Sequence, residues 1–336
     1  MRHLVIGAPN FVAMRLVQRL AERREDVRVI LHPGRNAQSQ PARRLAELSD
    51  QVRAIPLSDN AGLVAAAEGV DVIHYADWSY QDWGTEPVGD GPASQGLRNV
   101  LAAATRARIS RLVYVSTTDL YGFPGETVRE PLVPSPPGLP YVDARAEAEL
   151  AVWEHGRRVG LPLTVVRPTT VYGPGAPEFL VDAIRQLRDR RLYLVDRGTH
   201  IAGLTYVGNL VEAMILAGQA PEAAGQAYNI NDDSSVTWAQ YYGMLASMAE
   251  LPPPTVSYSR TRALMMASLW AKLGAARGRS ERPPLTRLMI EMMSVDQRYP
   301  IDKARRDYGY RPTYTFQEGL RETVGWLRES GVLADG

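Results

Sequence analysis

The chain of 336 residues contains no cysteine, which excludes disulfide bonds, thiolate metal sites and a thiol nucleophile. It also lacks an excess of either charge, because 38 lysine and arginine residues are balanced by 37 aspartate and glutamate residues. Such a chain offers no net field for nucleic acid or for an anionic membrane surface. The five histidines (3, 32, 74, 155 and 200) show no metal-ligand spacing, so we expect no metal.

Long apolar segments are absent as well. No stretch approaches the roughly 18 apolar residues of a membrane span, and the first residues lack the basic and apolar regions of a signal peptide. We therefore expect a soluble, cytoplasmic protein. A chain of 336 residues can bury a large core, as one α/β unit or as a core with a smaller lobe.

Short apolar runs alternate with helix-like segments in the first half of the chain. The runs are "HLVIG", "VRVILH", "VRAIPL", "VDVIHYA", "RLVYVST" and "LTVVRPT". The helix candidates between them are residues 11–23, 61–68, 93–107 and 143–158. Strands that are apolar at successive positions are buried on both faces, and their alternation with helices predicts a doubly wound parallel sheet.

Beyond Gly173 this rhythm loosens, although "LYLVDRG" and "AYNIND" indicate further short strands. We predict a Rossmann-like core over residues 1–170, with residues 171–336 forming mainly a smaller lobe interleaved with it. Ligands of such sheets bind beyond the carboxyl ends of the strands, so candidate site residues are sought in the loops that follow them.

The loop after the first strand differs from a dinucleotide-binding turn. Where three glycines are usual, the chain has Gly7, Asn10 and Ala13, and Pro9 removes one N–H donor. Gly7 allows a tight turn, whereas the side chain of Asn10 occupies space that a phosphate oxygen would need. This loop fits either a pyrophosphate site or an ordinary strand-to-helix turn.

The end of the second strand normally distinguishes the two forms of nicotinamide cofactor. "VILHPGRN" has no acidic residue to bind a ribose 2′-hydroxyl, but it offers His32 and Arg35. Basic groups there favour a 2′-phosphate, hence NADP(H) over NAD(H). The alternative is that Arg35 is a solvated surface charge.

A second group of polar residues suggests proton transfer. Ser116, Thr117 and Thr118 follow a buried strand, and Tyr141 and Arg145 lie one helical turn apart on one face of a predicted helix. A phenol beside a fixed cation ionises more readily, so Tyr141 could exchange a proton with a substrate oxygen held by Thr117. The alternative is that Tyr141 covers the helix entrance and Arg145 forms a surface ion pair.

Longer motifs carry a family resemblance over nearly the whole chain. They include "VSTTDLYG", "VVRPTTVYGPG", "LTYVGNLVEAMILA" and the closing "YPIDKARRDYGYRPTYTFQEGLRETVGWL". In these motifs the chain resembles the extended short-chain dehydrogenase/reductases, the NAD-dependent epimerase/dehydratase family. "TYVGNLVEA" and "PPLTRLMIEMM" are similar to the 3β-hydroxysteroid dehydrogenase-like branch, which implies an apolar small-molecule substrate.

The resemblance implies roles for individual positions. Thr117 matches the hydroxyl that binds the substrate oxygen, Tyr141 matches the catalytic tyrosine, and Arg145 stands in place of the family's lysine. The residues expected to bind NADP or NAD are Gly7, Asn10, Phe11, Val12, His32, Arg35, Ala76, Ser116, Tyr141, Arg145, Pro168 and Thr170.

Four departures from the family pattern concern the cofactor. They are the altered glycine motif, Pro56 where an adenine-binding aspartate is usual, Asp77 in "HYAD", and Arg145, whose planar fork is not equivalent to an ammonium. Together they suggest weakened, altered or lost cofactor binding, although the tyrosine and threonine are retained.

Substrate contacts are expected from the loop after the fourth strand and from the turn after Thr117. Trp78, Tyr80 and Trp83 are plausible walls for an apolar ligand, or they seal the loop to the core. Asp119 falls where sugar dehydratases carry a glutamate, while Thr118 replaces their aspartate. A Met-rich helix over 261–278 fits core filling or an adaptable pocket.

These observations leave three hypotheses for the function. The first is a redox enzyme that uses NADP or NAD on a carbinol or ketone. The second is a cofactor-independent isomerase, cyclase or lyase that uses Tyr141 and Arg145 for proton transfer, and the third is a non-catalytic metabolite-binding protein. By resemblance we also expect a homodimer, paired through the helices over 93–107 and 143–158.

Overall fold

A parallel sheet forms the core of the computed structural model, which describes residues 1–31, 40–77, 82, 95–130, 137–276 and 282–333. Seven strands join in the order β10-β6-β5-β4-β1-β2-β3. They are β1 (Arg2–Ala8), β2 (Asp26–Leu31), β3 (Gln51–Ala54), β4 (Val72–Tyr75), β5 (Arg111–Val115), β6 (Leu163–Pro168) and β10 (Gln226–Ile230). The predicted doubly wound α/β fold is confirmed.

The central strands are buried on both faces, as their continuous apolar runs predict. β4, β5 and β6 are buried at every position, and Val5 of β1 pairs with Val29 of β2 and His74 of β4. All seven strands run parallel, so their carboxyl ends meet at one edge of the sheet.

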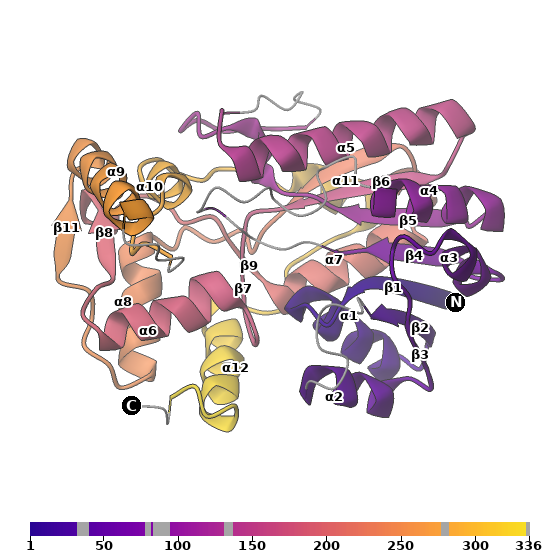
Figure 1. The fold of residues 1–336 in the computed structure, drawn as a ribbon, viewed down its shortest axis with the longest axis horizontal. Coiled ribbons are helices and arrows are strands. Elements are labelled where there is room, and N and C mark those ends of the chain that lie inside the picture. Colours follow the sequence, from indigo (N-terminus) through magenta and orange to yellow (C-terminus); the bar gives the residue numbers. More distant parts are fainter. Residues whose placement is uncertain (32–39, 78–81, 83–94, 131–136, 277–281, 334–336) are drawn as a thin grey trace.

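Two layers of helices cover the sheet (Figure 1). On one face α3 (Asn60–Ala67), α4 (Gln95–Ala107) and α5 (Pro140–Val159) pack together. On the other face α1 (Phe11–Glu22) packs between α2 (Gln40–Leu48) and α7 (Val207–Gln219). The four helices expected from the sequence correspond to α1, α3, α4 and α5. The last begins earlier than expected, because Pro140 occupies its first turn, where a missing N–H costs nothing.

The chain returns to the core sheet after it has left for the lobe. The stretch "AYNIND" supplies β10, which pairs with β6 from Gln226 opposite Thr164 to Ile230 opposite Pro168. Helix α11 (Asp302–Tyr308) packs beside this strand. The seventh strand of the core therefore comes from residues far beyond residue 170.

The lobe consists of helices with short paired strands. Its helices are α6 (Asp182–Arg188), α8 (Trp238–Met248), α9 (Arg260–Ala276), α10 (Arg287–Met293) and α12 (Phe316–Glu329). Its strand pairs are β8 (Tyr193–Val195) with β11 (Val256–Tyr258), and β7 (Thr170–Tyr172) with β9 (Leu204–Tyr206).

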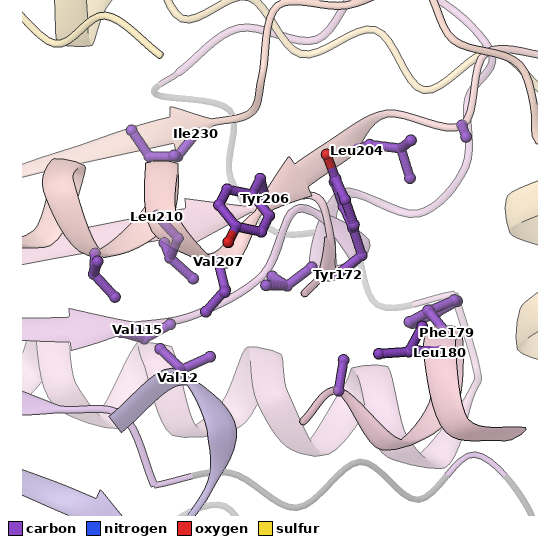
Figure 2. Packing of buried hydrophobic residues seen from close by; sticks show 14 of the residues in the cluster. Val12, Val115, Tyr172, Phe179, Leu180, Leu204, Tyr206, Val207, Leu210 and Ile230 are labelled. Carbon is purple, nitrogen blue, oxygen red and sulfur yellow. The ribbon is translucent and has the colours of Figure 1, made fainter. Parts of the chain in front are cut away.

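Buried apolar side chains form one cluster that runs from the core sheet into the lobe. Figure 2 shows members of this cluster from both parts, among them Val115 of the core and Tyr172 and Phe179 of the lobe. Within the lobe, the Tyr172 ring lies 5.5 Å from that of Tyr206 and 6.0 Å from that of Phe316, centroid to centroid, and it is fully buried. The two parts therefore share one core.

The described residues contain neither a membrane-spanning helix nor a group of metal ligands. No helix among them combines the length and the apolar character needed to cross a membrane. Within the same residues, no three histidine or acidic side chains are grouped so that they could hold a metal ion.

Candidate functional site

The turn after β5 places three polar residues at the carboxyl edge of the sheet. Thr117 caps the short 3-10 helix η1 (Thr118–Tyr121), and its Oγ1 accepts a hydrogen bond from the N–H of Asp119 at 3.2 Å. Ser116, Thr117 and Asp119 are buried, and the hydroxyl of Ser116 has no hydrogen-bond partner among the described residues. A buried hydroxyl without a partner is costly unless a ligand satisfies it.

Helix α5 presents Tyr141 and Arg145 to this turn. Both side chains are buried, with 4% and 8% of their surface exposed. The guanidinium of Arg145 donates from Nη2 to the carbonyl oxygen of Val115, the last residue of β5, at 2.6 Å. Arg145 therefore lies inside the protein against the end of β5, and the alternative of a surface ion pair is excluded.

The acidity of Tyr141 differs from the expectation. Burial raises the pKa of the Tyr141 phenol above its ordinary value, the charge of Arg145 lowers it, and the carboxylate of Asp119 raises it further. The guanidinium therefore acts in the expected direction, but the net shift of the Tyr141 pKa is upward. The physical reason is desolvation, which disfavours the phenolate more than one neighbouring cation stabilises it.

Two carboxyl groups near Tyr141 have pKa values that are raised toward neutral pH. Burial raises the pKa of Asp119 to about 6, against the opposing effects of a hydrogen bond with Thr117 and the charge of Arg145. Burial also raises the pKa of Glu178, in the short helix η2 (Pro177–Val181) of the lobe, to about 7. Each group can therefore gain or lose a proton near neutral pH.

An ion pair connects the β4 loop with the lobe beside these groups. Arg282 donates to the two carboxylate oxygens of Asp82 at 3.2 Å and 3.0 Å, and Thr286 also donates to Asp82. The side chain of Asp82 is fully buried, and its charge raises the pKa of both Tyr141 and Glu178. Neither Glu178 nor Arg282 was predicted from the sequence, because no spacing links them to the tyrosine motif.

On the cofactor side, Gly7 is required by its surroundings. Its φ is +124°, and a Cβ atom at this position would lie 2.6 Å from the backbone carbonyl carbon of Ala76. No other residue fits between β1 and the end of β4 without displacing backbone. Gly7 and Ala76 thus bring the two strand ends close together at the edge where a pyrophosphate would lie.

Asn10 replaces a glycine and uses both ends of its side chain. Its Oδ1 accepts from the N–H of Ala13 at 2.9 Å, and its Nδ2 donates to the carbonyl of Ala76 at 2.5 Å. Asn10 is therefore the N-cap of α1 and takes one of the amides that could bind a phosphate.

Whether a dinucleotide fits depends on the other N–H donors at the start of α1. Among the described residues, the N–H groups of Phe11 and Val12 have no acceptor. Together with the Ser116 hydroxyl they leave donors unsatisfied at the strand edge. The residues present therefore fit a pyrophosphate, with one amide fewer than a glycine-only loop would provide.

The last cofactor candidates from the sequence are Pro168 and Thr170. Pro168 ends β6, and the N–H of Thr170 already donates to the carbonyl of Gly203 at 3.1 Å. The backbone N–H of Thr170 therefore already has an acceptor within the protein, so it is not an open donor for a cofactor.

Several candidates lie outside the described residues. They are His32, Arg35, Trp78, Tyr80 and Trp83. Their predicted roles, the choice of cofactor form and the aromatic substrate wall, stay predictions. Thr118 is described and buried, beside Asp119 at the start of η1.

The chain is similar in sequence to proteins of one known family. The sequence model of the NAD dependent epimerase/dehydratase family matches residues 3–231. A 2-alkyl-3-oxoalkanoate reductase of Stenotrophomonas maltophilia (strain K279a) is 28% identical over 330 residues, covering 96% of this chain and 98% of that protein. A 3 beta-hydroxysteroid dehydrogenase/Delta 5-->4-isomerase of Mycobacterium tuberculosis (strain CDC 1551 / Oshkosh) is 26% identical over 343 residues, covering 96% and 89%.

Solved structures are similar in fold over nearly the whole chain. The crystal structure of gox2253 has a TM-score of 0.77 and 23% identity, covering 98% of this chain and 99% of that one. UDP-glucuronic acid 4-epimerase from Bacillus cereus in complex with NAD has a TM-score of 0.76 and 19% identity, with the same coverage. At these identities the similarity establishes the architecture and leaves the reaction to be argued from the site.

Proposed function

Because this chain belongs to the NAD dependent epimerase/dehydratase family, we propose that it is an NAD(P)-dependent reductase of a ketone in an apolar small molecule. The observation that carries the proposal is the buried Tyr141 on α5, next to Arg145 and facing the turn of Thr117 and Asp119. The relatives named above are a reductase and a hydroxysteroid dehydrogenase, which supports a ketone or carbinol as the reacting group.

The protein groups have separate tasks in this reaction. Tyr141 stays protonated at neutral pH, so it donates its phenolic proton to the carbonyl oxygen of the ketone. Thr117 holds that oxygen by a hydrogen bond, and Arg145 stabilises the phenolate that remains. Because its pKa is raised, the phenol is protonated at rest, which is the form that donates a proton during reduction of a ketone.

A nicotinamide cofactor supplies the hydride when it is bound. The N–H groups of Phe11 and Val12 and the hydroxyl of Ser116 are the donors proposed to hold it, and Gly7 allows the close approach. Nη2 of Arg145 is bound to the carbonyl oxygen of Val115, which holds the planar guanidinium in place, so it is less free to turn toward a ribose than the ammonium of the family's lysine.

We propose NADP(H) as the preferred form, because the segment after β2 carries His32 and Arg35 and no acidic residue. Calorimetric titration with NADPH and NADH tests the proposal in one experiment. We expect tighter binding of NADPH, and oxidation of it when an alkyl ketone is added. Absence of heat and of a thermal shift with both cofactors would contradict the redox proposal.

A second candidate function is proton transfer without redox chemistry, as in an isomerase, cyclase or lyase. Two observations favour it: Asp119 and Glu178 have pKa values of about 6 and 7 beside Tyr141, and Asn10 already occupies one phosphate-binding amide. Turnover by protein freed of cofactor would support this candidate, and a strict requirement for added nicotinamide would reject it.

We also propose a homodimer that pairs through α4 and α5. Leu150 on α5 is 43% exposed, and pairing through this helix would cover its apolar side chain. Light scattering on the wild type should give the mass of two chains, and Leu150→Arg should give one. A wild type that is monomeric at micromolar concentration would contradict the proposal.

A further inference from the structure

Arg167 is a buried arginine outside the predicted site, and it joins the two segments of the chain that carry the site residues. Arg167, near the end of β6, has 4% of its side chain exposed, and its ion-pair partner Glu149 has 1%. The guanidinium donates from Nε to Oε2 of Glu149 at 3.1 Å and from Nη2 to Oε1 of the same carboxylate. Two parallel bonds between planar groups fix both the distance and the orientation of the pair.

Glu149 lies on the face of α5 that carries the proposed chemistry. It follows Tyr141 by eight residues and Arg145 by four, so the three side chains project from the same side of the helix. A further donor, Nε1 of Trp153, binds Oε1 of Glu149 at 3.0 Å. Because Trp153 lies on the same helix, the rotation of α5 about its own axis is fixed by the two bonds from Arg167.

The third arm of Arg167 reaches the other segment of the site. Its Nη1 donates to the hydroxyl of Tyr121 at 2.5 Å, and its Cζ atom lies 5.0 Å from the centre of the Tyr121 ring. Tyr121 is the last residue of η1, the turn that begins after Thr117, and its hydroxyl donates to Oδ1 of Asn229 in β10 at 2.9 Å. One guanidinium thus binds α5 and η1 at once.

We propose that Arg167 is a positioning residue, which keeps the phenol of Tyr141 and the hydroxyl of Thr117 at the separation that proton transfer requires. The inference rests on the roles proposed above for these two residues. A lysine could not replace it, because an ammonium cannot span Glu149 and Tyr121 with three directed bonds. Since buried ion pairs often add little net stability, orientation is the contribution expected of this pair.

Two variants separate positioning from stability. Arg167→Met leaves Glu149 as an unpaired buried carboxylate, so it lowers both the Tm and kcat. The double variant Glu149→Met with Arg167→Met removes both charges, so the Tm recovers most of the loss while kcat stays at least tenfold below the wild type. The KM for the nicotinamide cofactor stays within about twofold, because α1 is untouched.

Arg111 provides a matched control. It is 5% exposed and donates to the hydroxyl of Thr164 and the carbonyl of Ala217, at the amino end of β5, away from the proposed chemistry. Arg111→Met should lower the Tm comparably and leave kcat within about twofold. Recovery of kcat together with the Tm in the double variant would overturn the proposal, as would an equal loss of kcat in Arg111→Met.

Hydrogen exchange distinguishes a failure of this inference from a failure of the proposed function. In the double variant, the amides of residues 117–121 and 140–149 should exchange at least tenfold faster, whereas those of α1 keep the wild-type rate. This readout needs no substrate, so it decides the role of Arg167 even if no ketone is reduced. Unchanged exchange in both segments would overturn the proposal.

Discussion

The two halves of the candidate site differ in how their polar groups are occupied. Around α5 and η1 protein groups pair with one another, as in the bond between Arg145 and Val115 and the contacts of Arg167. At the start of α1 the amides of Phe11 and Val12 have none among the described residues, and Asn10 covers the next one. The half around α5 and η1 is thus held by protein contacts, whereas the half at the start of α1 has N–H donors that a ligand could use.

Proton transfer and cofactor binding place different demands on the two halves. Proton transfer requires reacting atoms held within hydrogen-bond distance, so the α5 half cannot loosen without loss of rate. A dinucleotide touches many groups, so losing one amide to Asn10 lowers affinity and need not abolish binding. Substitutions in the two halves should therefore have effects of different kinds.

The largest effect is expected from Tyr141→Phe. Removing the hydroxyl takes away the proton donor and leaves the ring that packs in the core, so kcat should fall by about 10²–10⁴ while the Tm changes little. Steady-state kinetics on ketone reduction measure the fall, and calorimetry should show cofactor affinity within a few fold. An unchanged kcat would show that the α5 half does not supply the proton.

Asp119→Asn tests how much the burial of one carboxyl group in the α5 half lowers the folding stability of the protein. Raising the pKa of Asp119 from 3.8 to about 6 costs about 3 kcal/mol of folding stability at neutral pH, because the folded protein disfavours the ionised form. Below pH 3.8 the carboxyl is protonated in both states, so the variant gains nothing there. Its advantage should grow as the pH rises to about 6 and stay constant above.

Denaturant titrations at pH 4 and pH 7.5 measure that difference. Asp302→Asn serves as a control of opposite sign, because a hydrogen bond from Arg129 lowers the pKa of Asp302. Asp302→Asn should therefore bring no gain at pH 7.5. A variant Asp119→Asn that is less stable than the wild type at pH 7.5 would contradict the burial argument.

The smallest effect is expected in the α1 half, from two substitutions of Asn10. Asn10→Gly frees the amide of Ala13 at a cost of only a few tenths of a kcal/mol, so cofactor affinity should rise several fold. Asn10→Asp keeps the helix cap but adds a negative charge beside the pyrophosphate, so affinity should fall about tenfold or more. Calorimetric Kd values for NADPH measure both changes.

Equal affinity of the two Asn10 variants would mean that the cofactor does not reach this helix. The Tm of each variant provides the control, since both residues are accepted as N-caps and should leave the fold intact.

Sequence patterns predicted most of the core because its strands are continuous apolar runs. They also brought Tyr141 and Arg145 onto one helix face, since a spacing of four residues follows directly from helical geometry. The stretch "AYNIND" was expected to be a strand, but its pairing with β6 depends on the path of the chain through the lobe. Such long-range pairings leave no local signal.

The site was less predictable because burial decides its chemistry. The direction of the Tyr141 pKa depends on how much water the fold removes, and the sequence does not contain that quantity. The link from Arg167 to Glu149 joins residues 18 positions apart on a strand and a helix, with no motif in common. The two hydrogen bonds of the Asn10 side chain were likewise not predictable, because one of them depends on where the fold places the carbonyl of Ala76.

The late origin of β10 has a consequence for synthesis of the protein. Until residues 226–230 have left the ribosome, β6 is the outermost strand of the sheet and presents a row of unpaired backbone groups. A nascent chain is then exposed to edge-to-edge association with other nascent chains. Expressing residues 1–170 alone would make that open edge permanent, so the fragment should aggregate rather than fold.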